Sequence, residues 1–358
     1  MSNDEETKRL GWEEHIRRHP MMYVGKCGDG SVADDGLYVL LKEIINNSVD
    51  EYHAGFGKEI IVNIDNKRLT VRDFGRGIDF DRLVHFHKEL VDAKDKIHIA
   101  HRAIGLKGIG FITLVALSSE ATIISCQNGL LKRISTSQGK IVSIDDTQST
   151  SEPDGLSVSF IPDNQIFENY TIRVDYLRDL LKQYAVCEPG LKLKFGNEVF
   201  YAPFGMLNLI EDLSSSSDTQ NGIHIVDELC DIAIAPASNA GDSIVKSFVN
   251  GHPTIMAGSH VRFLIDAVYE CIKKLVPHRL LKCDLLANLI MCINIKIENP
   301  QFETCTRTKL GSRDMYEGGK SIKQYITELI ETNLSEILKS KPAIKNVLID
   351  TLTRTPLF

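Results

Sequence analysis

Residues 37–78 read LYVLLKEIINNSVDEYHAGFGKEIIVNIDNKRLTVRDFGRGI, and the spacing of their apolar residues changes halfway. From 37 to 51 the apolar residues recur every three or four positions, which predicts an amphipathic helix. Residues 59–65 and 68–73 are strand-like runs joined by the short turn Asn66–Lys67, which predicts a hairpin. The stretch therefore predicts a helix followed by two antiparallel strands.

One face of the predicted helix carries polar side chains. Glu43, Asn47 and then Asp50 or Glu51 recur about one helical turn apart, so carboxylates and an amide line the same face. Glu43 could polarise a water molecule, and Asn47 could ligate Mg²⁺, a hard ion that keeps several waters and shares itself with substrate phosphates. Alternatively, this face is simply exposed to solvent.

The segment Asp73-Phe74-Gly75-Arg76-Gly77-Ile78 ends the second predicted strand. An ionised carboxylate only accepts hydrogen bonds, which suits the exocyclic amino group of adenine, and Gly75 and Gly77 let the backbone turn tightly against a ligand. The alternative is an ordinary β-turn in which Asp73 caps the backbone.

A glycine-rich segment, Gly105-Leu106-Lys107-Gly108-Ile109-Gly110, precedes an apolar helical run at 111–117. Glycines before a helix leave backbone N–H groups free to face phosphate oxygens, although such turns are also common without a ligand. A P-loop is not supported, because Asp314 stands where the segment around Lys320 would need a glycine. An acidic helix, an Asp-x-Gly-x-Gly segment and a glycine loop, in this order, favour nucleotide binding.

The length of 358 residues predicts two domains. The polar segment from Ser215 to Gly222 reads as a solvated loop, so the expected domains are 1–214 and 215–358. The net charge of −7 argues against a uniformly basic DNA-binding surface, and the eight cysteines show no zinc spacing. No apolar run is long enough for a membrane span or a secretory signal, so we expect no membrane role and a cytoplasmic protein.

Further elements follow from the periodicity of the remaining chain. The first domain contains predicted strands at 121–126, 131–136 and 156–161. The second contains a predicted strand, helix and strand at 242–249, 261–275 and 289–297, and a helix at 321–338. Together these elements favour the α+β fold class.

The order of the motifs resembles the GHKL ATPase superfamily, and its details resemble the ATPase region of the type IIA DNA topoisomerase B subunits, in gyrase and topoisomerase IV. Residues 16–25, IRRHPMMYVG, are similar to the entry segment of that family, and residues 257–260, AGSH, to its Gly-Gly-Thr-His. Residues 304–310, TCTRTKL, are similar to its loop with a Gln-Thr-Lys signature. The resemblance implies a GHKL (Bergerat) α/β sandwich followed by a ribosomal-S5-like transducer domain.

The resemblance also implies site residues. Glu43 would be the general base for the attacking water, Asn47 the Mg²⁺ ligand, and Asp73 the residue that recognises adenine. Arg307 of the second domain would contact the γ-phosphate, with Lys309 as a second candidate. The remaining predicted nucleotide contacts are Asp50, Glu51, Arg76, Gly77, Ile78, Gly105, Leu106, Lys107, Gly108, Ile109, Gly110 and Ser157, with Glu51 and Arg76 pairing beneath the base.

By this resemblance, the chain is the ATP-binding and ATP-hydrolysing module of a topoisomerase B subunit. It would dimerise with a second copy on binding ATP, act on duplex DNA and work with an A-type subunit. It has no acidic cluster after Leu310 that could hold metals for DNA cleavage, so it would not cut DNA.

Some positions depart from the family pattern. Asn46 and Leu156 stand where the family has Asp and Thr, and Cys305 and Arg307 replace Gln and Lys. These departures motivate an alternative, a nucleotide-binding switch or dimerisation module with little or no turnover. A third possibility is a free-standing relative that serves another process on DNA.

Overall fold

The computed structural model describes residues 11–85, 109–214, 222–237, 243–276, 280–303 and 307–353. These residues form two compact units, the first comprising the chain up to 182 together with 190–201, and the second comprising 183–189 and everything from 202 onward. The second unit thus begins before the predicted boundary at 214. The reason is helix α8 (Met206–Leu213), which packs on strands of the second unit.

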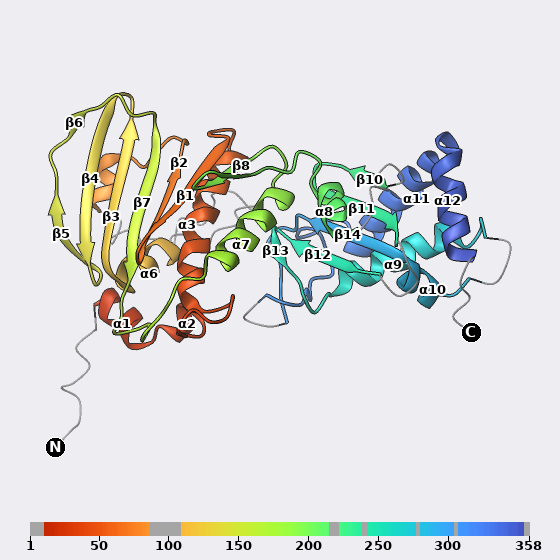
Figure 1. Ribbon diagram of the computed structural model, residues 1–358, viewed down its shortest axis with the longest axis horizontal. Helices are drawn as coiled ribbons and strands as arrows, with labels where there is room; N and C mark the ends of the chain where they lie inside the picture. Colours follow the sequence, from red (N-terminus) through yellow and green to blue (C-terminus); the bar gives the residue numbers. More distant parts are fainter. Residues whose placement is uncertain are drawn as a thin grey trace, which may run out of the picture. The chain divides into compact units, whose positions relative to one another are not determined.

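One large sheet forms the framework of the first unit (Figure 1). In the described residues its strands run in the order β5-β4-β3-β7-β2-β1-β8-β9, with β6 paired to β4. Neighbours are antiparallel except for β1 and β8, which are parallel. The strands are β1 (Glu59–Asp65), β2 (Arg68–Asp73), β3 (Ser118–Gln127), β4 (Leu130–Ser137), β5 (Lys140–Ile144), β6 (Gln148–Ser149), β7 (Gly155–Pro162), β8 (Lys192–Phe195) and β9 (Glu198–Phe200).

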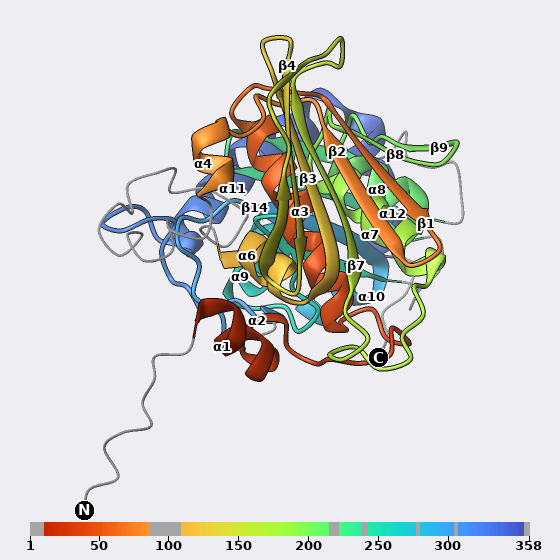
Figure 2. The same cartoon turned by 90° about the vertical axis from the view of Figure 1, so that its left-hand side faces the viewer.

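Helices α3 and α6 cover one face of this sheet (Figure 2). The apolar stripe of α3 is buried against the alternating apolar residues of β2 and β7, which explains why the helix and the hairpin form together. The predicted helix at 37–51 and the predicted hairpin are confirmed. The helices of this unit are α1 (Trp12–Arg18), α2 (Met21–Val24), α3 (Gly36–His53), α4 (Phe80–Val84), α6 (Ile109–Ala116) and most of α7 (Val174–Cys187).

The second unit contains a smaller mixed sheet in the order β10-β11-β14-β12-β13, in which only the β12–β14 pair is parallel among the described strands. Its strands are β10 (Ile223–Val226), β11 (Cys230–Pro236), β12 (Val245–Val249), β13 (His252–Pro253) and β14 (Leu289–Ile295). Besides α8, its helices are α9 (Ser259–Ile272), α10 (Lys282–Asn288), α11 (Ile322–Ser340) and α12 (Pro342–Thr353).

Helix α11 packs along α9 with a stripe of buried residues at the spacing of one face. The predicted strand, helix, strand and terminal helix of this region are confirmed as β12, α9, β14 and α11. Among the helices described, none combines the length and the apolar character that crossing a membrane requires.

Candidate functional site

Glu43 of α3 lies against the first turn of α6. A β carbon added to Gly110 would lie 2.0 Å from Oε2 of Glu43, so a side chain at this position would force the carboxylate to move. Two of the predicted motifs therefore meet at this point. Gly105, Leu106, Lys107 and Gly108 lie outside the described residues, whereas Ile109 and Gly110 form the start of α6.

Asn47 follows Glu43 one turn later on α3, and both side chains are partly buried. Within the described part of the chain, the carboxamide of Asn47 makes no hydrogen bond, so its oxygen is available as a ligand for a hard cation. The donor set fits Mg²⁺ that takes its other ligands from phosphates and water. Asp50 is also partly buried, one turn beyond Asn47.

The carboxylate of Asp73, at the end of β2, is held by three donors. Its Oδ1 accepts hydrogen bonds from the backbone N–H groups of Gly75, at 2.9 Å, and Leu156, at 3.1 Å. Its Oδ2 accepts from the hydroxyl of Ser48 on α3, at 3.1 Å. Burial raises the pKa of Asp73, and these three hydrogen bonds oppose that rise because they stabilise the ionised form.

The segment after Asp73 is fixed to its surroundings by hydrogen bonds. Arg76 forms a bidentate pair with Glu51 on α3, with Nη2 2.9 Å from Oε1 and Nε 3.1 Å from Oε2. The buried hydroxyl of Ser125 accepts from the N–H of Ile78 and donates to its carbonyl. Gly77 has a φ of 72°, in the left-handed region that glycine favours, and a β carbon there would lie 2.8 Å from the carbonyl oxygen of Cys126.

The strand register shows which way Ser157, one of the predicted nucleotide contacts, faces in the sheet. Ser157 of β7 pairs with Arg72 of β2, and directly paired residues share a face of the sheet. Asp73 faces the opposite side, together with Leu156, so the alternation does not bring Ser157 to the carboxylate. Leu156 donates its backbone N–H to Asp73 instead, which any residue except proline could do.

Comparisons with known proteins show which proteins the chain resembles. The family model for DNA gyrase B matches residues 205–355. The B subunit of DNA topoisomerase 4 from Borreliella burgdorferi is 31% identical over 92% of this chain and 55% of its own length. The B subunit of the type 2 topoisomerase from Aquifex aeolicus is 29% identical over 94% of this chain and 46% of its own length.

A solved structure covers both units. The 43K ATPase domain of gyrase B from Thermus thermophilus, solved in complex with an aminocoumarin, superposes with a TM-score of 0.74 and 26% identity over 96% of this chain and 94% of that structure. The chain belongs to the type II topoisomerase B-subunit family. It spans about half the length of the curated relatives that it matches.

The two positively charged side chains predicted to contact the γ-phosphate, Arg307 and Lys309, belong to the second unit of this topoisomerase relative. The guanidinium of Arg307 donates from Nη1 to Nε2 of His252, at 2.9 Å. Lys309 is paired with Glu303, with Nζ 2.7 Å from Oε2, so Arg307 is the better candidate for a ligand contact. Cys305 lies outside the described residues.

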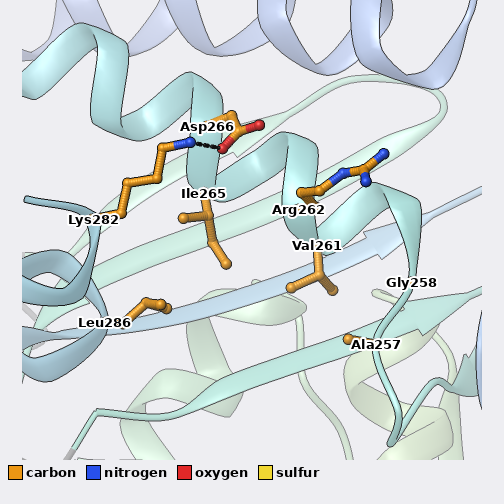
Figure 3. Close-up of a pocket in the computed structure, with 8 residues that line it drawn as sticks. All are labelled: Ala257, Gly258, Val261, Arg262, Ile265, Asp266, Lys282 and Leu286. Carbon is orange, nitrogen blue, oxygen red and sulfur yellow. Dashed lines mark hydrogen bonds and ion pairs between the residues drawn. The ribbon is translucent and has the colours of Figure 1, made fainter.

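A cavity of about 400 Å³ lies elsewhere in the topoisomerase-like second unit, between α9 and α10 (Figure 3). Val261, Ile265 and Leu286 line it, and an ion pair between Asp266 and Lys282 crosses one wall. Two of its charged groups, Asp266 and Lys282, already satisfy each other and leave only Arg262, so it lacks the convergent polar groups expected of a nucleotide site.

Sequence reasoning missed Ser48 and Ser125, which in this topoisomerase relative hold the predicted motifs in place. Ser125 carried a signal, because it continues the alternation of Ala121 and Ile123 and therefore occupies a buried position in a strand. A hydroxyl at a buried position needs a partner. Ser48 gave no such signal, because hydroxyls also occur along exposed helix faces.

Proposed function

We propose that this chain binds ATP against α3 and the start of α6, and hydrolyses it. The contact between Glu43 and Gly110 carries the proposal. It sets a carboxylate beside the amino end of a helix, where backbone N–H groups and the helix dipole favour phosphate oxygens. The carboxylate of Asp73, oriented by three donors, would accept a hydrogen bond from the amino group of adenine.

In the proposed reaction, Glu43 accepts a proton from a water molecule whose oxygen attacks the γ-phosphorus. The bond to the bridging oxygen of ADP breaks, and inorganic phosphate leaves. Asn47 would hold Mg²⁺, which when bound neutralises charge on the phosphates. Arg307, by the resemblance to the family, would contact the γ-phosphate.

We also propose that the chain is the ATPase region of a topoisomerase B subunit. Two copies would join when ATP binds, an A-type subunit would be the partner, and duplex DNA would be the segment that the dimer captures. Support comes from the relatives, which are B subunits. A rate of hydrolysis per molecule that rises with protein concentration would indicate that dimerisation controls turnover.

The substitution Glu43→Gln tests the catalytic proposal. It keeps the shape of the side chain but removes the base, so we expect hydrolysis to fall by about 10²–10⁴-fold. Calorimetry should still detect binding of a non-hydrolysable ATP analogue. The exposed Glu152→Gln provides a matched control with unchanged turnover.

Two other outcomes are informative. Saturable ATP binding with wild-type hydrolysis at background would support the alternative, a switch that binds nucleotide without turnover. Full hydrolysis by the Glu43→Gln variant would exclude this residue as the base.

A further inference from the structure

The backbone of Arg307, in the second unit, has an unusual conformation that its surroundings hold in place. Its φ is 57°, a left-handed conformation that costs a residue with a side chain about 1 kcal/mol or more and persists only where neighbours enforce it. Two backbone hydrogen bonds hold the residues that follow Arg307. The carbonyl of Thr308 accepts from the N–H of Met256 at 2.9 Å, and the N–H of Leu310 donates to the carbonyl of Ala257 at 3.2 Å.

These backbone bonds fix the chain after Arg307 to the loop between β13 and α9. They do not direct a side chain as long as that of arginine, which rotates about several bonds. The side chain of Arg307 is oriented by His252, the first residue of β13. Nε2 of His252 accepts a hydrogen bond from Arg307 Nη1 at 2.9 Å. A guanidinium can only donate, so this contact requires an imidazole with an unprotonated Nε2.

The chemical type of this acceptor distinguishes Arg307 from other arginines. Many of them pair with carboxylates: Arg17 with Asp163, Arg18 with Glu14, Arg68 with Glu120, Arg76 with Glu51, Arg173 with Asp175 and Arg178 with Glu198. Arg307 has no carboxylate within ion-pair distance in the described part of the chain. A neutral acceptor orients a guanidinium without cancelling its charge.

We propose that His252 is the positioning residue for Arg307 and holds its guanidinium ready for an anionic phosphoryl group. The inference rests on the proposed function, because that function supplies the anion, the γ-phosphate of ATP. One donor of the planar group serves His252, and among the described residues its remaining donors meet no acceptor, so they can serve oxygens of the ligand.

Turnover of the full chain provides the first test. We expect His252→Ala to lower kcat about tenfold, the value of one oriented hydrogen bond to a charged group, with a smaller change in KM. His252→Gln, whose amide oxygen can accept, should recover most of the loss. The exposed Arg313→Ala, which removes a positive charge close to Arg307 in the sequence, is the control and should leave kcat unchanged.

A double-mutant cycle of His252 and Arg307 distinguishes a positioning role of His252 from a general loss of structure. If His252 acts only through Arg307, the double variant His252→Ala, Arg307→Ala should be no slower than Arg307→Ala alone. Losses that multiply in the double variant would overturn the inference, as would a His252→Ala variant with wild-type kcat. A His252→Ala variant with lower thermal stability but unchanged kcat would also overturn the inference.

A measurement without ATP separates this inference from the proposed function. Nitrogen-15 NMR of the imidazoles should show His252 neutral with its proton on Nδ1, and Arg307→Ala should shift the Nε2 resonance. Protonated Nε2 in the wild-type chain would reject the inference even if hydrolysis is normal. The expected spectrum together with absent hydrolysis would instead reject the proposed function alone.

Discussion

Gly110 and Glu43 approach each other so closely that a methyl group on Gly110 would lie 2.0 Å from Oε2 of the carboxylate. In an open helix, replacing glycine by alanine would stabilise by about 1 kcal/mol through helix propensity. At Gly110 we expect the contact with Glu43 to make the same change destabilising. Gly110→Ala should displace Glu43, lower hydrolysis at least tenfold and lower the melting temperature.

A second variant checks that this contact is the cause. In the Glu43→Ala background the colliding carboxylate is absent, so adding Gly110→Ala should no longer lower the melting temperature. Thermal unfolding of the four proteins in this cycle gives the answer. Equal losses in both backgrounds would place the effect of Gly110 elsewhere.

Ser48 and Asp73 make the next prediction, which concerns binding rather than chemistry. Burial raises the pKa of Asp73, and Ser48 opposes the rise by donating to Oδ2. Protonation removes the negative charge and makes one carboxyl oxygen a donor, which weakens the hydrogen bond that Asp73 can accept from adenine's amino group. Affinity for a non-hydrolysable ATP analogue should therefore fall as the pH is lowered, beginning at a higher pH than for an ordinary aspartate.

Removing the hydroxyl shifts this dependence. Ser48→Ala should raise the pKa of Asp73 further and move the loss of affinity to higher pH, as measured by calorimetry between pH 7.5 and 5. Asp73→Asn is the control, with weak binding that no longer changes over this range. Coincident pH curves for wild type and Ser48→Ala would count against the hydrogen bond as a support for Asp73.

The pair of Glu51 and Arg76 should matter less for stability than for binding. Burial raises the pKa of Glu51, but the hydrogen bonds and charge of Arg76 outweigh it, so the net shift is downward. The pair therefore stabilises the fold above the ordinary glutamate range and loses this contribution as the pH falls through the lowered value.

Arg76→Gln tests the pair. Because its guanidinium is more than half exposed, the loss of unfolding free energy should stay within about 1 kcal/mol. Arg76 also lies over Phe56, 4.4 Å from the ring centre, and its backbone donates to Glu51. We expect several-fold weaker nucleotide binding in calorimetry, and an unfolding loss of several kcal/mol would show that the pair is structural instead.

Local periodicity predicted α3 and the β1–β2 hairpin, because burial on one helix face or one sheet face leaves a regular pattern in the sequence. The resemblance supplied the pairing of Glu51 with Arg76. Both kinds of information depend on residues that are near in sequence or belong to recognisable motifs.

Contacts between distant segments could not be predicted in this way. Ser125 and Ile78 are 47 residues apart, and His252 and Arg307 are 55 apart. Ser157 adjoins Leu156 in the sequence, but adjacent residues of a strand face opposite sides of the sheet. The register with Arg72, visible only in the folded sheet, decides between them.

His260 supplies the last prediction, on stability in acid. It is fully buried, its Nε2 lies 3.2 Å from Thr254 Oγ1, and its Nδ1 has no partner among the described residues. Burial lowers its pKa from 6.5 to about 4, because the charged imidazole would lose its hydration.

The unfolded chain therefore takes up this proton first as the pH falls. The contribution of His260 is complete above pH 6.5 and is lost between 6.5 and about 4, amounting to roughly 3 kcal/mol at 1.36 kcal/mol per pH unit. Urea unfolding of wild type and His260→Asn at pH 7, 6, 5 and 4 measures it as the change in the difference between the two proteins. A difference that stays constant with pH would mean that His260 takes up its proton in the folded state as readily as in the unfolded one.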